Sequence, residues 1–334
     1  MGRQGVWTGK RLQDISDQLK TMDICVSANT VGDLLHKLGY ALHSNRKSLS
    51  GSNSPDRDRQ FNYINRQRKL FAQKELPVIS VDTKKKELVG LFKNAGRVWS
   101  TEATPVNDHD FRSQGKGMAI PYGIYDWQTN RGSVVVGTSH DTPEFAVDAI
   151  VQWWRVDGHR TYGNASSLLI LADSGGSNGY RCRFWKYALQ EKLVEPYGLT
   201  VTVCHYPPGA SKWNPIEHRL FSEISKHWAG QPLTDYSTMV KLIGQTRTRT
   251  GLRVKCTLTT KRYDIGIKIT DKEMAQLNLH KHAVLPDWNY TLCPHKNRRE
   301  LLEQMEVGPV GCHFEQKVAE ALEARAERMT REGM

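Results

Sequence analysis

The segment Leu168–Ala172 is an unbroken apolar run that ends at Asp173. Such a run is typical of a strand buried on both faces, and strands of this kind occur in sheets that helices cover on both sides. The segment Pro77–Val81 is also apolar in character and ends at Asp82. Both segments therefore predict buried strands of an α/β sheet, each followed directly by a carboxylate.

The surrounding elements indicate a mixed sheet. Alternating and periodic apolar residues predict strands at 89–100, 123–127, 133–137 and 199–204, and helices at 142–156, from 174 to about 195, and from 214 onward. Three antiparallel strands followed by alternating strands and helices form a mixed five-stranded sheet flanked by helices. This order predicts an α/β fold of the ribonuclease H-like type.

Upstream of the sheet, residues 8–40 predict two short helices. One apolar stripe begins at Leu12, and a second begins at Val31, shortly after Ser27, which is a good N-cap. Gly39 then ends the second helix. The pattern is typical of a helix-turn-helix, whose second helix reads DNA, although an ordinary helical hairpin has the same spacing.

The expected DNA contacts of this all-α segment lie on its second helix and in the basic stretch beyond it: Asn29, Thr30, Lys37, Arg46 and Lys47.

The N-terminal quarter of the chain is strongly basic. A polar stretch at 44–60 precedes a predicted helix that ends near Lys74, and residues 1–75 contain 13 basic and 7 acidic side chains, a balance of +6. The whole chain carries +12. Such an excess favours a polyanionic partner such as DNA, although a solvated helix face would explain several of these charges.

Composition also limits where the protein acts. No window approaches the about 18 apolar residues of a membrane span. Met1–Lys10 has no apolar segment typical of a secretory signal. The 6 cysteines are scattered without a CxxC pair, which fits a reducing compartment better than a disulfide framework or a zinc site. We therefore expect a cytoplasmic protein without a membrane partner.

Three carboxylates are candidates for a metal-dependent active site. Asp82 and Asp173 follow strands that would be neighbours in the predicted sheet, and Glu217 lies in the first turn of the helix after the last strand. Grouped carboxylates repel one another unless divalent cations neutralise them. Two Mg²⁺ ions about 3.5–4 Å apart can catalyse phosphoryl transfer at such a site. Asp126 and Glu223 are competing candidates, and each acid could instead be a turn, cap or helix-dipole residue.

Basic and aromatic residues flank these carboxylates. We expect DNA contacts from two sets, one following Asp82 and one preceding Glu217: Lys84, Lys85 and Lys86, and Lys212, Trp213 and Asn214. A charged turn would equally explain the first set, and a packed core aromatic would explain Trp213. The glycines of Ser174–Gly179 would allow close approach of DNA, but their order is not that of a nucleotide-binding P-loop.

Longer motifs add a family resemblance. The chain resembles the ISAzo13-type transposases, a bacterial insertion-sequence family of the DDE group, from about residue 34 to 294. The resemblance is carried by VISVDTKKKELVG, LLILADSGGSNGYR and HYPPGASKWNPIEHRLFS, and by NRKSLSG, PDRDRQF, AIPYGIYD, HDTPEFAV, TRTGLRVKC and DWNYTLCP. It implies a ribonuclease H-like catalytic domain with two Mg²⁺ or Mn²⁺ ions held by Asp82, Asp173 and Glu217. The NPIE context selects Glu217 over Glu223.

The same resemblance implies a DNA transposase that cuts at the inverted repeats of an insertion sequence and joins the freed 3′-hydroxyl to target DNA, as a homo-oligomer on double-stranded DNA. The expected organisation is a helix-turn-helix segment at 1–50, a basic linker helix at 51–75, a catalytic domain at 76–295 and a charged helical tail at 296–334. Family members usually carry more DNA-binding sequence ahead of the helix-turn-helix, so we expect this segment to be truncated.

Two other functions stay open. A ribonuclease H-like nuclease would cleave without strand transfer, but the basic helical pair argues against it. A decayed transposase would act only as a DNA-binding protein, which the complete set of three acids argues against.

Overall fold

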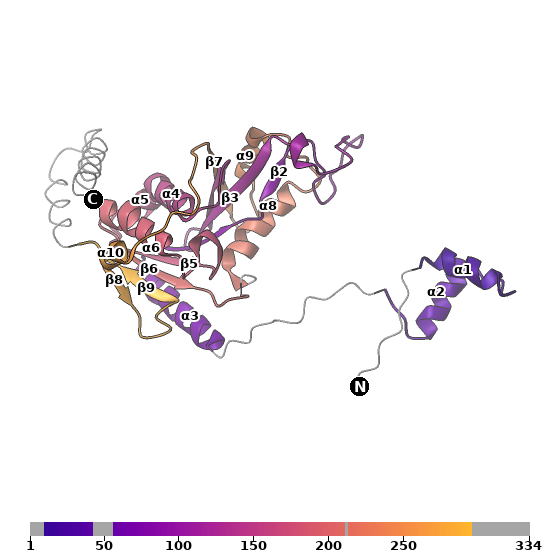
Figure 1. Cartoon of the computed structure of the whole chain (residues 1–334), viewed down its shortest axis with the longest axis horizontal. Helices are drawn as coiled ribbons and strands as arrows, with labels where there is room; N and C mark the ends of the chain where they lie inside the picture. Colours follow the sequence, from indigo (N-terminus) through magenta and orange to yellow (C-terminus); the bar gives the residue numbers. More distant parts are fainter. Residues whose placement is uncertain (1–9, 43–55, 211–212, 296–334) are drawn as a thin grey trace. The chain divides into compact units, whose positions relative to one another are not determined.

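The computed structural model describes residues 10–42, 56–210 and 213–295 (Figure 1). Arg46, Lys47, Lys212 and the tail at 296–334 lie outside the described residues, so the expectations for them stay predictions. The chain divides into two compact units, Met1–Gly51 and Ser52–Met334. Each unit is described by itself.

The first unit contains the two expected helices, α1 (Leu12–Lys20) and α2 (Ala28–Lys37). The Ser27 side chain caps α2, because its Oγ accepts a hydrogen bond from the Thr30 backbone N–H at 3.1 Å. Gly39 follows the helix at φ 84°, a left-handed conformation that favours glycine. The predicted helices and their caps are therefore confirmed.

The second unit is built on a sheet that has nine strands within the described residues, in the order β7-β4-β3-β1-β5-β6-β9-β8, with β2 paired to β3. The strands are β1 (Val78–Thr83), β2 (Glu87–Val89), β3 (Gly117–Asp126), β4 (Arg131–Gly137), β5 (Ser167–Ala172), β6 (Thr200–His205), β7 (Arg253–Thr259), β8 (Leu279–Lys281) and β9 (Asn289–Leu292).

The central strands β4-β3-β1-β5-β6 form the expected mixed, ribonuclease H-like sheet. β1, β5 and β6 run parallel, and β3 is antiparallel to both of its neighbours. The sheet is wider than the predicted five strands, because β7 pairs in parallel with β4 at one edge and β9 and β8 extend the other. These three strands are short or largely exposed, so they lack the buried apolar run that identified β5.

The predicted strand at 89–100 is wrong beyond Val89. After β2 the chain turns away from the sheet at Gly90, whose φ is 153° and whose N–H donates to the Leu233 carbonyl at 2.8 Å. The residues from 90 to 116 contain the short 3₁₀ helix η1 (Arg112–Gln114) and no strand. The strand that pairs with β2 is β3, which begins at Gly117, earlier than the sequence predicts.

Helices cover both faces of the sheet (Figure 1). The helical elements of this unit are α3 (Arg57–Gln73), α4 (Pro143–Trp153), η2 (Trp154–Gly158), α5 (His159–Thr161), η3 (Gly176–Asn178), α6 (Arg183–Leu189), η4 (Gln190–Val194), α7 (Glu195–Tyr197), η6 (Glu217–Phe221), α8 (Ser222–His227), α9 (Tyr236–Gly244) and α10 (Asp271–Ala275). Side chains of α4, α6 and η4 pack on one face. Those of α3, η6, α8 and α9 pack on the other. None of the helices among the described residues is long and apolar enough to span a bilayer.

The helix α3 lies within the segment expected as a basic linker, but its inner face packs on the sheet. Ile64 is buried against Val78 and Leu169. Gln60 is fully buried and exchanges hydrogen bonds with Asn289 of β9, at 2.7 and 2.8 Å. α3 is therefore one of the helices that cover this face of the sheet in the second unit.

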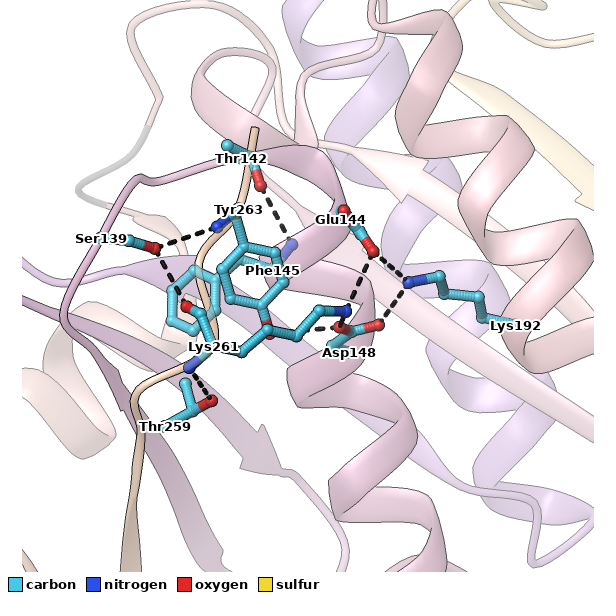
Figure 2. Close-up of polar contacts among 9 residues, drawn as sticks. All are labelled: Ser139, Thr142, Glu144, Phe145, Asp148, Lys192, Thr259, Lys261 and Tyr263. Atoms are coloured by element: carbon cyan, nitrogen blue, oxygen red, sulfur yellow. Dashed lines mark hydrogen bonds and ion pairs between the residues drawn. The ribbon is translucent and has the colours of Figure 1, made fainter. Parts of the chain in front are cut away.

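A second polar cluster ties the chain after β7 to α4 (Figure 2). Lys192 and Lys261 each bond Glu144 and Asp148 of α4, at distances of 2.7 to 3.1 Å. Partial burial disfavours the charged form of Glu144, but the hydrogen bonds from the two lysines outweigh it and hold its pKa below the usual value. These acids are neutralised by side chains of the protein itself.

Candidate active site

The sheet register places two of the predicted carboxylates side by side. Val81 of β1 is level with Ala172 of the parallel strand β5. Asp82 and Asp173 are the next residue on each chain, so both lie at the same edge of the sheet. This edge is where the carboxyl ends of parallel strands place functional side chains in open α/β sheets.

Glu217 comes from the helix that packs beside this edge. It begins η6, whose Phe221 is buried over Gly123 of β3. Gly123 is the residue paired with Asp82, and a Cβ there would lie 2.4 Å from the Phe221 ring. The absence of a side chain at this position therefore lets η6 approach the sheet closely, on the face that carries Asp82.

The three carboxylates influence one another electrostatically. Burial, and then the charge of Asp173, raises the pKa of Asp82 well above its usual range, and Glu217 adds to the effect. Burial and the charge of Asp173 also raise the pKa of Glu217. The pKa of Asp173 is raised by burial. The group is therefore short of positive charge and would gain from a bound cation.

An open cavity of about 430 Å³ lies in front of Asp82 and Asp173. A further acid, Asp141, lines the same cavity, where it accepts a hydrogen bond from the Thr83 hydroxyl at 3.1 Å. Glu217 does not line this cavity. Asp141 is not among the site residues predicted from the sequence. It directly precedes Thr142, the N-cap of α4, and acids are common at such positions for structural reasons alone, so its position does not indicate a functional role.

Asn214 lies in a place different from the one expected. It is fully buried, and its Nδ2 donates to the Asp173 Oδ1 at 3.1 Å. Its Oδ1 accepts a hydrogen bond from the Ser80 hydroxyl of β1. The amide therefore bridges β1 and the Asp173 carboxylate, and in this structure it is not exposed for the DNA contact predicted from sequence.

The backbone of Asp173 is held as well. The imidazole of His205 is fully buried, and burial lowers its pKa to about 4, so the ring is neutral. Its Nδ1 lies 2.9 Å from the Asp173 carbonyl oxygen, and its Nε2 lies 3.3 Å from the Tyr290 hydroxyl. A neutral ring satisfies both contacts by donating from Nδ1 and accepting at Nε2.

The three lysines after Asp82 lie in different environments. Lys84 is buried, where its Nζ pairs with Glu87 at 2.9 Å and lies 4.5 Å from the centre of the Trp228 ring. Lys85 and Lys86 are exposed, and both line the cavity. Lys85 is therefore open to an external phosphate, whereas Lys86 is exposed but lies 3.7 Å from Asp141, and Lys84 is held in the interior.

Trp213 lies partly exposed beside the third carboxylate. Its side chain is 43% exposed, and the Arg57 guanidinium stacks 4.2 Å from the ring centre. Phe61 packs edge-on against it, with ring centroids 6.0 Å apart. Both partners belong to α3, so this helix contributes to the surface around Trp213.

The two competing acids have other partners. Asp126 is level with Ile79, at the opposite end of β1, and accepts hydrogen bonds from the Tyr162 hydroxyl at 2.8 and 2.9 Å. Glu223 pairs with Lys226 at 2.7 Å. Neither acid is a source of the raised pKa at Asp82 or Asp173.

The candidate DNA-contacting residues of the first unit lie on α2. Asn29 and Lys37 are exposed. Thr30 is also exposed, but its hydroxyl lies 2.8 Å from that of Ser27, so it takes part in the helix cap.

A comparison with known families decides which group the chain is part of. The sequence profile described as the Rhodopirellula transposase DDE domain matches residues 3–294. The chain belongs to this DDE transposase family. The resemblance found in the sequence is thereby confirmed. Among curated proteins, no sequence matches this transposase.

Several solved structures are also similar to this chain. The Mos1 transposase paired-end complex with the left transposon end has 15% identity and a TM-score of 0.41, covering 70% of this chain and 65% of that one. The Mos1 strand transfer complex has 13% identity and a TM-score of 0.40, covering 70% and 64%. The simian T-cell lymphotropic virus intasome, in complex with the PP2A regulatory subunit B56 gamma, has 9% identity and a TM-score of 0.28, covering 58% and 60%. The chain thus spans about two thirds of the length of the Mos1 chains it matches.

The residues at this sheet edge suit a hard divalent cation in their chemistry. Their donors are carboxylate oxygens, the ligands that Mg²⁺ prefers, and their charges are not matched by the protein. Their arrangement is not that of a finished site: within the described ranges, no three acidic, histidine or cysteine side chains are grouped as a metal centre. Since Glu217 stands back from the cavity, it would have to move toward the two aspartates to share an ion with them.

Proposed function

We propose that this family member is a metal-dependent DNA transposase whose active site is formed by Asp82, Asp173 and Glu217. The observation that carries the proposal is the pair of aspartates at neighbouring strand ends, with Glu217 close enough to raise the pKa of Asp82. Structural acids are usually neutralised within the protein, as Glu144 and Asp148 are. Acids that form no ion pair with a lysine or arginine of the described residues, as Asp82, Asp173 and Glu217 do not, fit a site that external cations complete.

The three carboxylates would hold two Mg²⁺ or Mn²⁺ ions. Mos1 paired-end complexes are known with Mn and with Mg. When bound, such ions activate an attacking oxygen and stabilise a leaving oxygen. Asp141, at the wall of the same cavity, would act beside the triad by orienting Thr83 and Lys86.

The proposed reaction has two steps of the same chemical class. In the first, a water oxygen bonds to phosphorus at the end of the element, and the bond from phosphorus to the 3′-oxygen breaks to leave a free 3′-hydroxyl. In the second, that hydroxyl oxygen bonds to a phosphorus of the target strand, and the target's own 3′-oxygen leaves with the proton. No covalent link to the protein is required, which agrees with a site made of carboxylates.

The neighbouring side chains would position the acids and the DNA. Asn214 would hold the Asp173 carboxylate in one orientation through Nδ2. Lys85 and Lys86 are exposed at the cavity and suit phosphate contacts. Trp213, stacked under Arg57, would pack against an unpaired base, which is how proteins commonly hold single strands.

The first unit would recognise the element ends. Its helical pair fits a helix-turn-helix with α2 toward the major groove, where Asn29 and Lys37 are exposed. The expected partners are therefore terminal inverted repeats and target DNA, bound by more than one copy of the chain. Mos1 forms a paired-end complex with transposon-end DNA.

Metal-dependent cleavage and joining of DNA carrying the flanking inverted repeats tests this function. We expect the native chain to cut and join with Mg²⁺ or Mn²⁺. Asp173→Asn should lose at least about a thousandfold in rate while still binding the DNA, because several kcal/mol of charge stabilisation is removed. Glu223→Gln is the matched control on the same helical segment as Glu217, and it should stay active.

Other outcomes have distinct meanings. If Asp173→Asn cuts as well as the native chain, or if Glu223→Gln is inactive and Glu217→Gln active, the assignment of the triad is wrong. Binding without any cleavage by the native chain would favour the alternative of a decayed transposase. Footprinting then separates specific protection of the ends from uniform, salt-sensitive binding.

A further inference from the structure

Three arginines lie in a row across one edge of the sheet. Arg131 begins β4 and is level with Arg253, which begins the neighbouring parallel strand β7. Arg253 also forms a β-bridge with Arg247 on its other side. Paired positions on adjacent strands project to the same face and stand about 5 Å apart. The three side chains therefore form a continuous row, which we call the arginine row.

The arginine row is exposed and is not held by ion pairs. All three side chains are exposed to solvent. In the part of the chain that the structure describes, none of them forms an ion pair with an acid. Two acids line the same small cavity as Arg131 and Arg253. Asp126 is level with Arg131 on β3 and accepts hydrogen bonds from the Tyr162 hydroxyl, and Asp157 is paired with Lys255 and Arg160.

Part of this arrangement costs stability. Like charges placed directly opposite each other on neighbouring strands are destabilising, and the arginine row repeats that contact twice. Asp126, which is level with Arg131 on the other side, offsets part of this repulsion. Lys255 and Arg160 are two further basic residues nearby, and both pair with Asp157. Because two positive charges face one negative charge there, they add to the positive potential around the arginine row. Exposed arginines that outnumber the nearby acids, and that form no ion pair with them among the described residues, fit a surface that binds an anion.

The arginine row faces away from the proposed active site. Arg131 is level with Asp126, which is itself level with Ile79, so the row lies at the other end of β1 from Asp82. The faces also differ. Ser133, on the same face as Arg131, donates to Asp157 of η2 at 3.4 Å, whereas Gly132 packs under Leu220 of η6. Asp82 lies on the face of η6, so DNA held at the carboxylates would not reach the arginine row without bending around the sheet.

We propose that the arginine row, Arg131, Arg247 and Arg253, binds the phosphate backbone of duplex DNA and forms a DNA-binding surface separate from the carboxylate site. Guanidinium groups pair with phosphate oxygens through two parallel hydrogen bonds. A linear row of them suits a linear polyanion better than a small anion, which would engage only one or two. The contact is sequence-independent, because it involves the backbone alone. It does not require that the chain cleave DNA.

The test compares the salt dependence of DNA binding between the native chain and a triple variant, Arg131→Gln, Arg247→Gln and Arg253→Gln. The probe is a short random-sequence duplex without the element ends. Each lost phosphate contact should reduce the slope of log affinity against log salt by about 0.9, so the slope should become less steep by about 2.7. The affinity at low salt should fall about tenfold or more.

Two further variants act as controls. Arg262→Gln, Lys268→Gln and Lys272→Gln remove the same charge from exposed positions elsewhere, and they should change the slope much less. Replacing the arginine row with three lysines keeps its charge and should leave the affinity within about threefold of native, because the long-range attraction remains.

Thermal melting separates binding from folding. Repulsion within the row and the attraction of Arg131 to Asp126 oppose each other, so the triple Gln variant should melt within a few degrees of the native chain. A melting temperature lower by more than about ten degrees would mean that the arginines stabilise the fold, which overturns the proposal. A slope equal to that of the native chain would also overturn it, as would tighter binding of a structured RNA than of DNA through the same three arginines. Asp173→Asn should lose cleavage but keep the native slope of log affinity against log salt. That result would show that DNA binding by the arginine row can be tested separately from the proposed catalytic function.

Discussion

Two acidic clusters of the same unit are treated in opposite ways by their surroundings. Glu144 and Asp148 on α4 lie between Lys192 and Lys261, and each acid bonds both lysines (Figure 2). Asp82 and Asp173, at the strand ends, face an open cavity and each other. Both clusters join segments that are distant in sequence. Only in the first cluster do lysines of the protein balance the charges of the acids.

The difference has a measurable consequence in the charge state of the two clusters. The lysines hold the pKa of Glu144 below its usual value, whereas burial and neighbouring acids raise the pKa of Asp82. A buried acid with a lysine partner stabilises the fold, and one without a partner opposes it until a cation arrives. The comparison therefore separates acids whose charge the protein balances from acids whose charge it leaves unbalanced.

The largest expected effect is on catalysis. Asp82→Asn should lower the rate of metal-dependent strand cleavage by at least about a thousandfold, because a carboxylate lost from the site removes several kcal/mol of charge stabilisation. Asp148→Asn removes the same charge from the lysine-paired cluster and should change the rate less than about threefold. Single-turnover cleavage of end DNA measures both. Equal losses in the two variants would refute the distinction between the clusters.

Metal binding should stabilise only the strand-end cluster. At a hundred times its dissociation constant, Mg²⁺ or Mn²⁺ should add about 2.7 kcal/mol to the free energy of unfolding and raise the melting temperature by several degrees. Asp82→Asn should show no such rise, and without metal it should melt above the native chain because one repulsive charge is gone. Scanning calorimetry with EDTA and with excess metal measures this. A full metal shift in Asp82→Asn would place the ion elsewhere.

A smaller effect is expected from the residue that supports Asp173. Asn214→Ala leaves the Asp173 carboxylate without the hydrogen bond from Nδ2, and partners of metal ligands typically contribute ten- to a hundredfold in affinity or activity. We expect a loss of about that size in metal affinity, with activity partly recovered at high Mn²⁺. Isothermal titration and rate measurements across metal concentrations measure it. An unchanged metal affinity with lower stability would make Asn214 merely structural.

The finest distinction is the sign of the pH dependence, measured without metal. Because the pKa of Asp82 is raised on folding, the folded state keeps a proton that the unfolded state releases, so stability falls as pH rises from about 4 toward the raised pKa. The lowered pKa of Glu144 has the reverse effect, since its contribution is present above about 4.3 and falls as pH drops below that value. The free energy of unfolding, measured in urea across pH, should therefore depend less on pH in each variant. In Asp82→Asn the fall in stability above pH about 4 should be smaller. In Glu144→Gln the fall below pH about 4.3 should be smaller, by about 1–2 kcal/mol. Matching pH profiles in the two variants would contradict the comparison.

The strand-end aspartates could be read from sequence because each follows an apolar run, and position after a buried strand is a local property. The central order of strands followed for the same reason. The role of Asn214 could not be read in this way, since it depends on Ser80 and Asp173, which lie 134 and 41 residues away. A polar residue beside a catalytic acid looks the same in sequence whether it faces the acid or the solvent.

Lys84 and the outer strands illustrate the same limit. Lys84 is one of three consecutive lysines in the sequence, yet it alone is buried, because Glu87 and Trp228 provide a partner and a packing surface. β7 lacks a buried apolar run, and its place is set by pairing with β4 rather than by its own composition. Tertiary contacts of this kind override local propensity.

The bond between Gln60 and Asn289 spans 229 positions of the chain, and this sets a limit on when the molecule can assemble during its synthesis. β1 leaves the ribosome well before β5, its parallel partner, and α3 cannot close its polar contacts until β9 has been made. Non-local pairings of this kind fold slowly, because the intervening chain must be ordered before they form. The nascent chain therefore contains Asp82, Asp173 and Glu217 before it contains β9, the strand that bonds α3. We expect the carboxylate site to become ordered only after β9 has been translated.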